Sequence, residues 1–261
     1  MILAGRRRGP TDGPTTRLTF VHGFTQTSRS WDPVVDDLSR DHECICLDAP
    51  GHGDSHDGAR SLWQCADDIA ESSTGGVLVG YSMGARMALH AVLARPYLFG
   101  GLILVSGTAG IENEGERSTR RDADNALADR IETIGVSDFI DEWLSNPMFA
   151  GLSPAMAMKP DRLRNDASGL ADSLRHAGTG TQDSLWDRLG ELAIPVLIVT
   201  GTLDAKFSEI GRRMASMMNH STLVSVEGAG HTVHLERTAE FVSLVRAWLV
   251  DYASAIARPT A

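Results

Sequence analysis

Short apolar runs alternate with helical segments along most of this 261-residue chain. The apolar runs are rich in leucine or β-branched residues and are bounded by Gly, Pro or Asp, as expected of buried parallel strands. They are Leu18–Val21, Cys44–Leu47, Val77–Val79, Leu102–Val105, Val196–Thr200 and Leu223–Val226. Helical patterns follow most of them, at Trp31–Ser39, Met83–Ala94, Ser208–Met218 and Ala239–Val250. This alternation predicts an α/β fold with a doubly wound, mostly parallel sheet.

The alternation stops between Thr108 and Arg188. This stretch is polar and helix-rich, includes the charge-dense run Glu112–Arg121, and contains no good strand. We therefore expect residues 1–107 and 189–261 to form the α/β core and residues 108–188 to form an inserted helical cap. Because α/β sheets place their sites at the carboxyl ends of the strands, the cap is expected to cover such a site.

Composition restricts the partners of the chain. Its formal net charge of −10 argues against nucleic acid or an anionic membrane surface as the main partner, although a pocket can be locally basic. No apolar stretch approaches the roughly 20 residues that span a bilayer. Cys44, Cys46 and Cys65 lack metal-ligand spacing and are expected to be reduced thiols. We expect a soluble cytoplasmic protein, as a monomer or small homo-oligomer, with no nucleic acid or membrane partner.

A pentapeptide with glycines on both sides of a serine, Gly80-Tyr81-Ser82-Met83-Gly84, lies between a predicted strand and a predicted helix. Glycines are needed there because bulky side chains would clash around a serine held on a strained, exposed strand-to-helix turn. The order of strand, turn and helix predicts that Ser82 is a nucleophile or base rather than a structural turn residue.

A reactive serine needs a base, and the base needs an acid that orients it. Asp204 follows the predicted strand Val196–Thr200, and His231 follows Leu223–Val226 in a glycine-rich loop. No acid occurs at Ser106 to Thr108, where an alternative acid would be expected. The sequence therefore predicts a triad of Ser82, Asp204 and His231, with each residue just beyond a strand.

Other residues compete for these roles. His234 lies three residues after His231, but the glycines before His231 better suit a loop that brings a side chain into a site. His22, His52 and Asp48 precede the serine, and the simpler interpretation is that they shape tight turns through hydrogen bonds to the backbone.

An oxyanion hole requires two backbone N–H groups that point at one position. Met83 is expected to supply one at the start of the helix after Ser82. Phe24, in the loop after the first long strand, is expected to supply the other.

Together these motifs resemble the α/β-hydrolase superfamily over nearly the whole chain. The resemblance rests on His22-Gly23-Phe24, on Asp48-x-Pro50-Gly51-His52-Gly53-x-Ser55, on the serine pentapeptide, and on Asp204 and His231. It implies the fold but not the reaction, because this fold hosts many chemistries. In place of the antiparallel first hairpin of the superfamily, we expect one edge strand near Ile2–Ala4.

A narrower resemblance is to the 2-succinyl-6-hydroxy-2,4-cyclohexadiene-1-carboxylate synthases of menaquinone biosynthesis. The matching motifs are Ser82-Met83-Gly84-Ala85-Arg86, Glu116-Arg117-x-x-Arg120, Phe139-x-x-x-Trp143-x-x-x-Pro147-x-Phe149, Arg162-x-x-Asn165, Gly178-Thr179-Gly180-x-Gln182-x-x-Leu185-Trp186, Asp204-Ala205-Lys206-Phe207 and Gly230-His231-Thr232-Val233-His234-Leu235-Glu236. The resemblance implies a lyase that removes pyruvate from a tricarboxylate without a cofactor or metal. It also implies that Ser82, activated by His231, acts as a base on a ring carbon while Asp204 orients the imidazole.

A polyanionic substrate would require fixed cations, preferably arginines that bind carboxylates bidentately. The candidates are Arg86, Arg120, Arg162 and Lys206, with Arg164 as an alternative to Arg162. Each could instead be a surface charge or the partner of an acid. Tyr81 and Trp143 are candidate pocket walls, and Trp143 could equally be packing within the cap.

Two other functions remain open from the sequence. The same triad would serve a hydrolase of esters or carbon–carbon bonds, but a hydrolase of neutral esters would tolerate loss of Arg86. A non-catalytic ligand receptor is the third possibility, and an apparently complete triad with two oxyanion donors argues against it.

Overall fold

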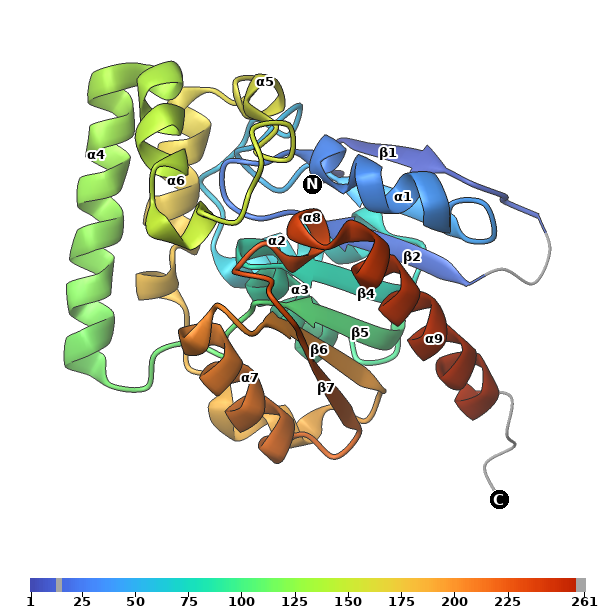
Figure 1. Ribbon diagram of the computed structural model, residues 1–261. Coiled ribbons are helices and arrows are strands. Elements are labelled where there is room, and N and C mark those ends of the chain that lie inside the picture. The colour runs from blue at the N-terminus through green and yellow to red at the C-terminus, as the bar shows by residue number, and fades with distance from the viewer. Residues whose placement is uncertain (13–15, 257–261) are drawn as a thin grey trace.

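The computed structural model describes residues 1–12 and 16–256, and its centre is a seven-stranded sheet (Figure 1). The strand order is β1-β3-β2-β4-β5-β6-β7, and every neighbouring pair is parallel except β1 with β3. The strands are β1 (Gly5–Arg8), β2 (Arg17–Val21), β3 (Glu43–Leu47), β4 (Gly76–Tyr81), β5 (Phe99–Val105), β6 (Val196–Gly201) and β7 (Ser221–Val226). The predicted doubly wound, mostly parallel sheet is confirmed.

The edge strand β1 corrects the expectation of a strand near Ile2–Ala4. It lies at Gly5–Arg8 and pairs antiparallel with β3. Three consecutive arginines form most of this strand. Two of them form ion pairs with carboxylates far along the chain: Arg6 with Asp32 and Arg7 with Glu43, each with a nitrogen–oxygen distance of 2.6 Å. These distant ion pairs explain why a charged segment, rather than the apolar one before it, joins the sheet.

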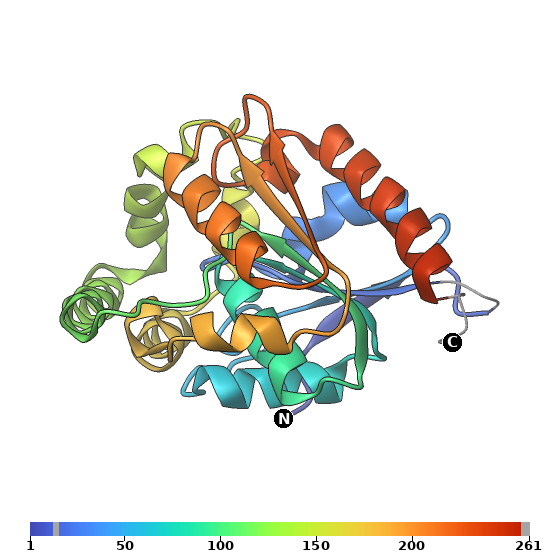
Figure 2. The ribbon, with the colours of Figure 1, turned by 90° about the horizontal axis from the view of Figure 1, so that it is seen from below.

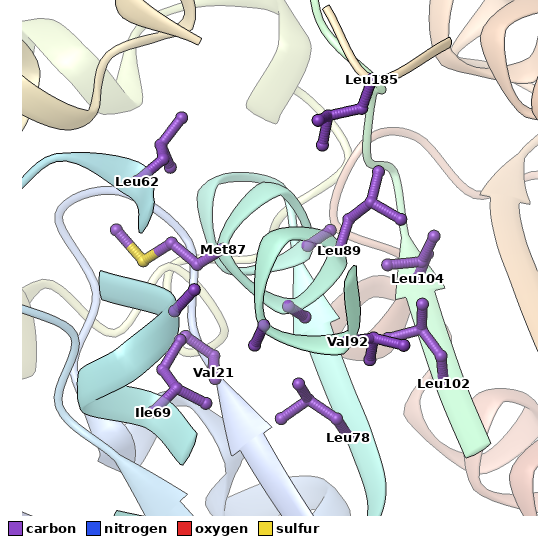
Figure 3. Close-up of a cluster of buried hydrophobic side chains, with 14 of the residues drawn as sticks. Val21, Leu62, Ile69, Leu78, Met87, Leu89, Val92, Leu102, Leu104 and Leu185 are labelled. Atoms are coloured by element: carbon purple, nitrogen blue, oxygen red, sulfur yellow. The ribbon is translucent and has the colours of Figure 1, made fainter. Parts of the chain in front are cut away.

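Helices cover both faces of the sheet, as Figure 2 shows from below. On one face α1 (Asp32–Leu38) and α9 (Thr238–Ile256) contact each other and pack on one cluster of buried side chains. On the other face lie α2 (Leu62–Ser72), α3 (Met83–Ala94) and α7 (Ala205–Met217). Figure 3 shows α3 at the centre of that second cluster, with Met87, Leu89 and Val92 directed toward side chains from the strands and α2.

Helix α2 was not predicted from the sequence. Its N-cap Ser61 accepts a hydrogen bond from the N–H of Gln64, and the Gln64 side chain accepts one from the N–H of Ser61. This reciprocal capping box is a signal that sequence analysis could have used.

The segment between β5 and β6 is helical and contains no strand. Its elements are α4 (Glu114–Leu144), η2 (Pro147–Phe149), α5 (Lys159–Arg162), α6 (Ala167–Ala177), η3 (Thr179–Thr181) and η4 (Trp186–Glu191). Helices α4 and α6 lie beside one another at one end of the molecule and share a small core that includes Ile131, Phe139 and Leu170 (Figure 1). Gly135 breaks α4 with φ of 78°, a conformation that glycine adopts without strain.

Candidate active site

Ser82 lies on a strained turn between β4 and α3. Its φ is 52° and its ψ is −106°, which is unfavourable for a residue with a side chain. The turn is tight on both sides: a Cβ on Gly80 would lie 2.4 Å from the carbonyl oxygen of Gly84, and one on Gly84 would lie 2.2 Å from that of Val21. Only glycines allow the backbone to approach this closely and present the serine hydroxyl above the sheet.

The structure brings the three predicted triad residues into a hydrogen-bonded row. His231 Nε2 lies 3.1 Å from Ser82 Oγ, and His231 Nδ1 lies 2.7 Å from Asp204 Oδ2. Asp204 is also the N-cap of α7, where its other oxygen accepts a hydrogen bond from the N–H of Phe207. A proton on Nδ1, held by Asp204, leaves Nε2 free to take the hydroxyl proton of Ser82.

Side chains that the sequence reasoning gave no role hold the backbone of the His231 loop. The Ser106 hydroxyl donates to the carbonyl oxygen of His231 at 2.8 Å. The Glu236 carboxylate accepts the N–H groups on both sides of His231, from Gly230 at 2.7 Å and Thr232 at 2.9 Å. Nothing in the sequence pointed to Ser106, whereas Glu236 was part of the motif around His231.

None of the competing histidines pairs with Ser82: His22 and His52 bond to the backbone, and both ring nitrogens of His234 are buried without a hydrogen-bond partner in the described part of the chain. His22 Nε2 accepts the N–H of Ala49 at 3.0 Å, and His52 Nδ1 lies 3.0 Å from the carbonyl oxygen of Pro50. His234 is fully buried, and its ring lies 4.5 Å from that of Tyr81. Burial lowers the pKa of both His52 and His234 to about 3, so both stay neutral near neutral pH.

Asp48 accepts hydrogen bonds from the N–H of Ser28 at 2.6 Å and from that of Asp54 at 3.0 Å. Its carboxylate therefore joins two loops, which matches the turn-stabilising role expected from the sequence.

A cavity of about 880 Å³ lies between the carboxyl ends of the strands and the helical segment. Ser82 and His231 line it, as do all eight residues predicted to bind substrate. These eight are Phe24, Tyr81, Met83, Arg86, Arg120, Trp143, Arg162 and Lys206. Met83 is the first residue of α3, so its N–H lacks a partner within the helix. That N–H can serve as one oxyanion donor, with the N–H of Phe24 as the second.

Arg86 and Arg162 are the most informative cations of the cavity. They are 7% and 1% exposed, and neither forms an ion pair with a carboxylate among residues 1–12 and 16–256. Arg86 donates to the carbonyl oxygen of Ala177 at 2.8 Å, and Arg162 to that of Ala157 at 2.8 Å. Burial is the main cause that lowers the pKa of each arginine to about 10, and the nearby charge of Arg120 contributes to the lowering at Arg86. Both arginines remain charged at neutral pH, with donors left for an anion.

The other cations are arranged differently. Arg120 pairs with the buried carboxylate of Asp124 at 2.8 Å while it also lines the cavity. Lys206 lies at the cavity with its ammonium 5.6 Å from the centre of the Phe207 ring. Arg164 pairs with Asp54 at the surface, so the structure favours Arg162 over Arg164 as the residue of the cavity.

Aromatic rings form the apolar wall of the cavity. Trp143 packs edge to face against Phe24, with ring centres 5.3 Å apart, and it also lines the cavity, so it serves cap packing and the pocket wall together. Its indole N–H is buried and has no hydrogen-bond partner in the described part of the chain. The Tyr81 hydroxyl lies 3.1 Å from Thr232 Oγ1, and burial raises the pKa of Tyr81.

The described residues form neither a metal-binding cluster nor a membrane-spanning helix. No cluster of three or more His, Cys, Asp or Glu side chains in residues 1–12 and 16–256 could hold a metal ion. Over the same residues, every helix is too short or too polar to cross a membrane.

A strained serine after a parallel strand, with His231 and Asp204 after later strands, is the arrangement of an α/β hydrolase. The model of the alpha/beta hydrolase family matches residues 20–244. The putative 2-succinyl-6-hydroxy-2,4-cyclohexadiene-1-carboxylate synthase of Bacillus subtilis is 35% identical over 92% of this chain and 93% of its own length. The synthase of that name from Citrobacter koseri is 30% identical over 93% and 96%. The chain therefore belongs to the alpha/beta hydrolase family, and within it to the family of these synthases.

A solved structure supports the same relationship. The structure of MenH from S. aureus superposes with a TM-score of 0.86 at 28% identity, covering 95% of this chain and 98% of that one.

Proposed function

We propose that this chain is a lyase of menaquinone biosynthesis. It eliminates pyruvate from 2-succinyl-5-enolpyruvyl-6-hydroxy-3-cyclohexene-1-carboxylate and yields 2-succinyl-6-hydroxy-2,4-cyclohexadiene-1-carboxylate. The observation that carries the proposal is the pair of buried arginines, Arg86 and Arg162, which lack carboxylate partners in the cavity that Ser82 lines. Buried charge without a partner is costly, so its place beside a reactive serine indicates an anionic substrate. The relatives at 30% and 35% identity described above are named for the same product.

In the proposed reaction, ring carbon 2 of the substrate carries the proton that is removed, between the succinyl ketone and the ring double bond. Ser82 Oγ takes this proton as its own passes to His231 Nε2, 3.1 Å away. Electrons from the broken C–H bond form the C2–C3 double bond, the ring double bond moves to C4–C5, and the C5–O bond breaks. The leaving enolate of pyruvate is then protonated on its methylene carbon.

Charge develops on the succinyl ketone oxygen while the proton leaves. The N–H groups of Phe24 and Met83 would stabilise this oxygen, and Asp204 would stabilise the positively charged His231. Arg86, Arg162 and Arg120, with Lys206, would hold the carboxylates and so fix ring carbon 2 near Ser82. The residues themselves supply every group in this scheme, without a cofactor or metal.

We also propose that residues 108–188 act as a cap over a core formed by residues 1–107 and 189–261. Helices α4 and α6 share a small core, and cap residues such as Arg120, Trp143 and Arg162 line the cavity opposite Ser82. The proposed setting is the cytoplasm, with the protein as a monomer or small homo-oligomer. Cys44, Cys46 and Cys65 are free and buried, as in a reducing compartment.

The test is pyruvate release by the purified protein. Because the tricarboxylate is made by an upstream enzyme, it is generated in situ, and pyruvate is measured with lactate dehydrogenase. We expect release above the rate without protein, and a loss of about 10²–10⁴-fold in Ser82→Ala, as for removal of a general base. Absence of pyruvate, together with rapid cleavage of p-nitrophenyl esters, would favour a hydrolase. Pyruvate release at the same rate by Ser82→Ala would remove the proposed base.

A further inference from the structure

A strained residue follows the proposed oxyanion donor Phe24. Thr25 has φ of 68° and is fully buried. Its β-branched side chain makes this left-handed conformation especially unfavourable, so neighbouring groups must impose it. The N–H of Thr25 lies 3.4 Å from His52 Nε2, and its carbonyl oxygen accepts a hydrogen bond from Asn165 Nδ2 at 2.7 Å. Its hydroxyl accepts one from Arg162 Nη1.

Asn165 links three segments through a single buried amide. The side chain is 6% exposed, and its Oδ1 accepts the N–H of Gly53 at 2.8 Å. Its Nδ2 donates to the carbonyl oxygen of Thr25 and, at 2.9 Å, to that of Arg162. The two loops that carry Thr25 and Gly53 belong to the proposed core, whereas Asn165 and Arg162 belong to the proposed cap. An amide is needed because this place requires an acceptor and two donors together.

Arg162 therefore has two connections in the structure. Its Nε donates to Ala157 and its Nη1 to the hydroxyl of Thr25, while the guanidinium lines the cavity and forms no ion pair in the described part of the chain. The atoms that would hold a substrate carboxylate are thus one hydrogen bond away from the residue that follows Phe24.

We propose that Asn165 is a positioning residue that aligns the N–H of Phe24 with Ser82 by holding Thr25, and that it couples this alignment to the substrate-binding Arg162. The proposal rests on the proposed function for the roles of Phe24 and Arg162. Without the amide, the carbonyl oxygen of Thr25 is left unpaired in a buried place and the strained loop can relax. The peptide that carries the Phe24 N–H moves with it.

The proposal predicts different effects on the reaction rate for a displaced oxyanion donor and for loss of the Arg162 charge. Removal of one oxyanion donor typically costs about 10²–10³-fold in rate, and a displaced donor is expected to cost at least about 10-fold. That loss applies to every reaction that builds negative charge on an oxygen next to Ser82, including reactions of uncharged reagents. Loss of the Arg162 charge, in contrast, applies mainly to anionic substrates.

The experiment measures how fast a small, uncharged fluorophosphonate labels Ser82, beside the kcat and KM of pyruvate elimination. We expect Asn165→Ala to slow labelling by at least about 10-fold at a temperature where circular dichroism shows a folded protein, and to lower kcat more than it raises KM. Asn165→Asp keeps the acceptor and the size but loses both donors, and it is expected to slow labelling similarly. Arg162→Met is expected to impair elimination strongly and labelling only slightly. The matched control is Asn125→Ala on α4, which is expected to label at the rate of the unmodified protein.

The possible outcomes distinguish a positioning role of Asn165 from a purely structural one. Labelling of folded Asn165→Ala at the unmodified rate would overturn the proposal and leave Asn165 as a structural residue. Slower elimination with unchanged labelling would also overturn it, since Asn165 would then act on Arg162 alone. If Asn165→Ala fails to fold, the labelling rate of Asn165→Asp decides in its place. If the unmodified protein releases no pyruvate but Asn165→Ala labels slowly, the proposed function fails while the positioning role stands.

Discussion

Arg86→Met is the sharpest test of the proposed anion site, because it removes a charge and nearly preserves volume. Arg86 is 7% exposed on α3, one helical turn beyond Ser82, and the one hydrogen bond that its side chain donates within the described part of the chain goes to the carbonyl oxygen of Ala177. A carboxylate bound bidentately would gain two charge-assisted hydrogen bonds, each worth about 1.5–3 kcal/mol. Their loss amounts to at least about 3 kcal/mol, which corresponds to a drop of about 100-fold in kcat/KM for pyruvate elimination.

The same substitution should leave the fold intact. It removes a buried charge that has no carboxylate partner among the described residues, which favours folding, and it removes the bond to Ala177, which costs about 1 kcal/mol. We therefore expect the melting temperature of Arg86→Met to stay within about 4 °C of the unmodified protein. Methionine is expected to change fluorophosphonate labelling of Ser82 by less than about twofold, because that reagent carries no charge.

The matched control is Arg95→Met, at the exposed C-terminal end of the same helix, where Arg95 pairs with Asp67 across the surface. Surface pairs contribute about 0–1 kcal/mol, so this variant is expected to keep its kcat/KM. A kcat/KM for Arg86→Met within about threefold of the unmodified value would refute the assigned role, and so would a loss that appears only where the protein unfolds.

Three further predictions concern the fold and the cavity. Gly84→Ala is expected to lower the melting temperature by several degrees and slow labelling of Ser82, because the new Cβ would meet a backbone oxygen at 2.2 Å, whereas Gly190→Ala has no atom nearer than 3.8 Å and should be tolerated. Burial lowers the pKa of His90 from 6.5 to about 4 in the folded protein. Between these two values the imidazole is protonated in the unfolded chain but neutral in the folded one. Stability is therefore lost as the pH falls through this window, and in urea titrations His90→Gln should reduce the loss between pH 7 and pH 5 by about 2 kcal/mol. An unchanged loss would contradict that assignment. Trp143→Phe is expected to change the melting temperature by no more than a few degrees, because the smaller ring leaves a void but also removes an indole N–H that is buried without a hydrogen-bond partner in the described part of the chain. A larger drop in the melting temperature would show that packing of the indole ring dominates.

The sequence alone predicted the elements that form from a local pattern of apolar and polar residues. Buried parallel strands are apolar runs, so six of the seven strands were expected at nearly their observed positions. Helix α3 begins and ends where the pattern predicts, at Met83 and Ala94. Strand β1 was misplaced because arginines such as Arg6 enter the sheet through ion pairs with residues far along the chain, and periodicity does not record such pairs.

The candidate site also contains residues that the sequence predicts and contacts that it does not. Ser82, Asp204 and His231 are predictable because the fold fixes their order and each follows a strand. Arg162 was preferred to Arg164 from the sequence, but Arg164 stayed an alternative there, because which of the two side chains faces the cavity depends on the fold. The contacts that hold Thr25 join residues more than 100 positions apart and have no local sequence pattern.

Four energetically costly residues of this structure lie at or beside one cavity. Ser82 and Thr25 are non-glycine residues with positive φ, and Arg86 and Arg162 are buried charges without carboxylate partners in the described part of the chain. Each lowers the free energy of unfolding, and none is needed to pack the sheet or its helices. Packing alone would favour methionine or leucine at the two arginines, as it does elsewhere in the core. The presence of both arginines in the cavity that Ser82 lines is therefore explained by an anionic ligand that supplies the missing charge when it binds.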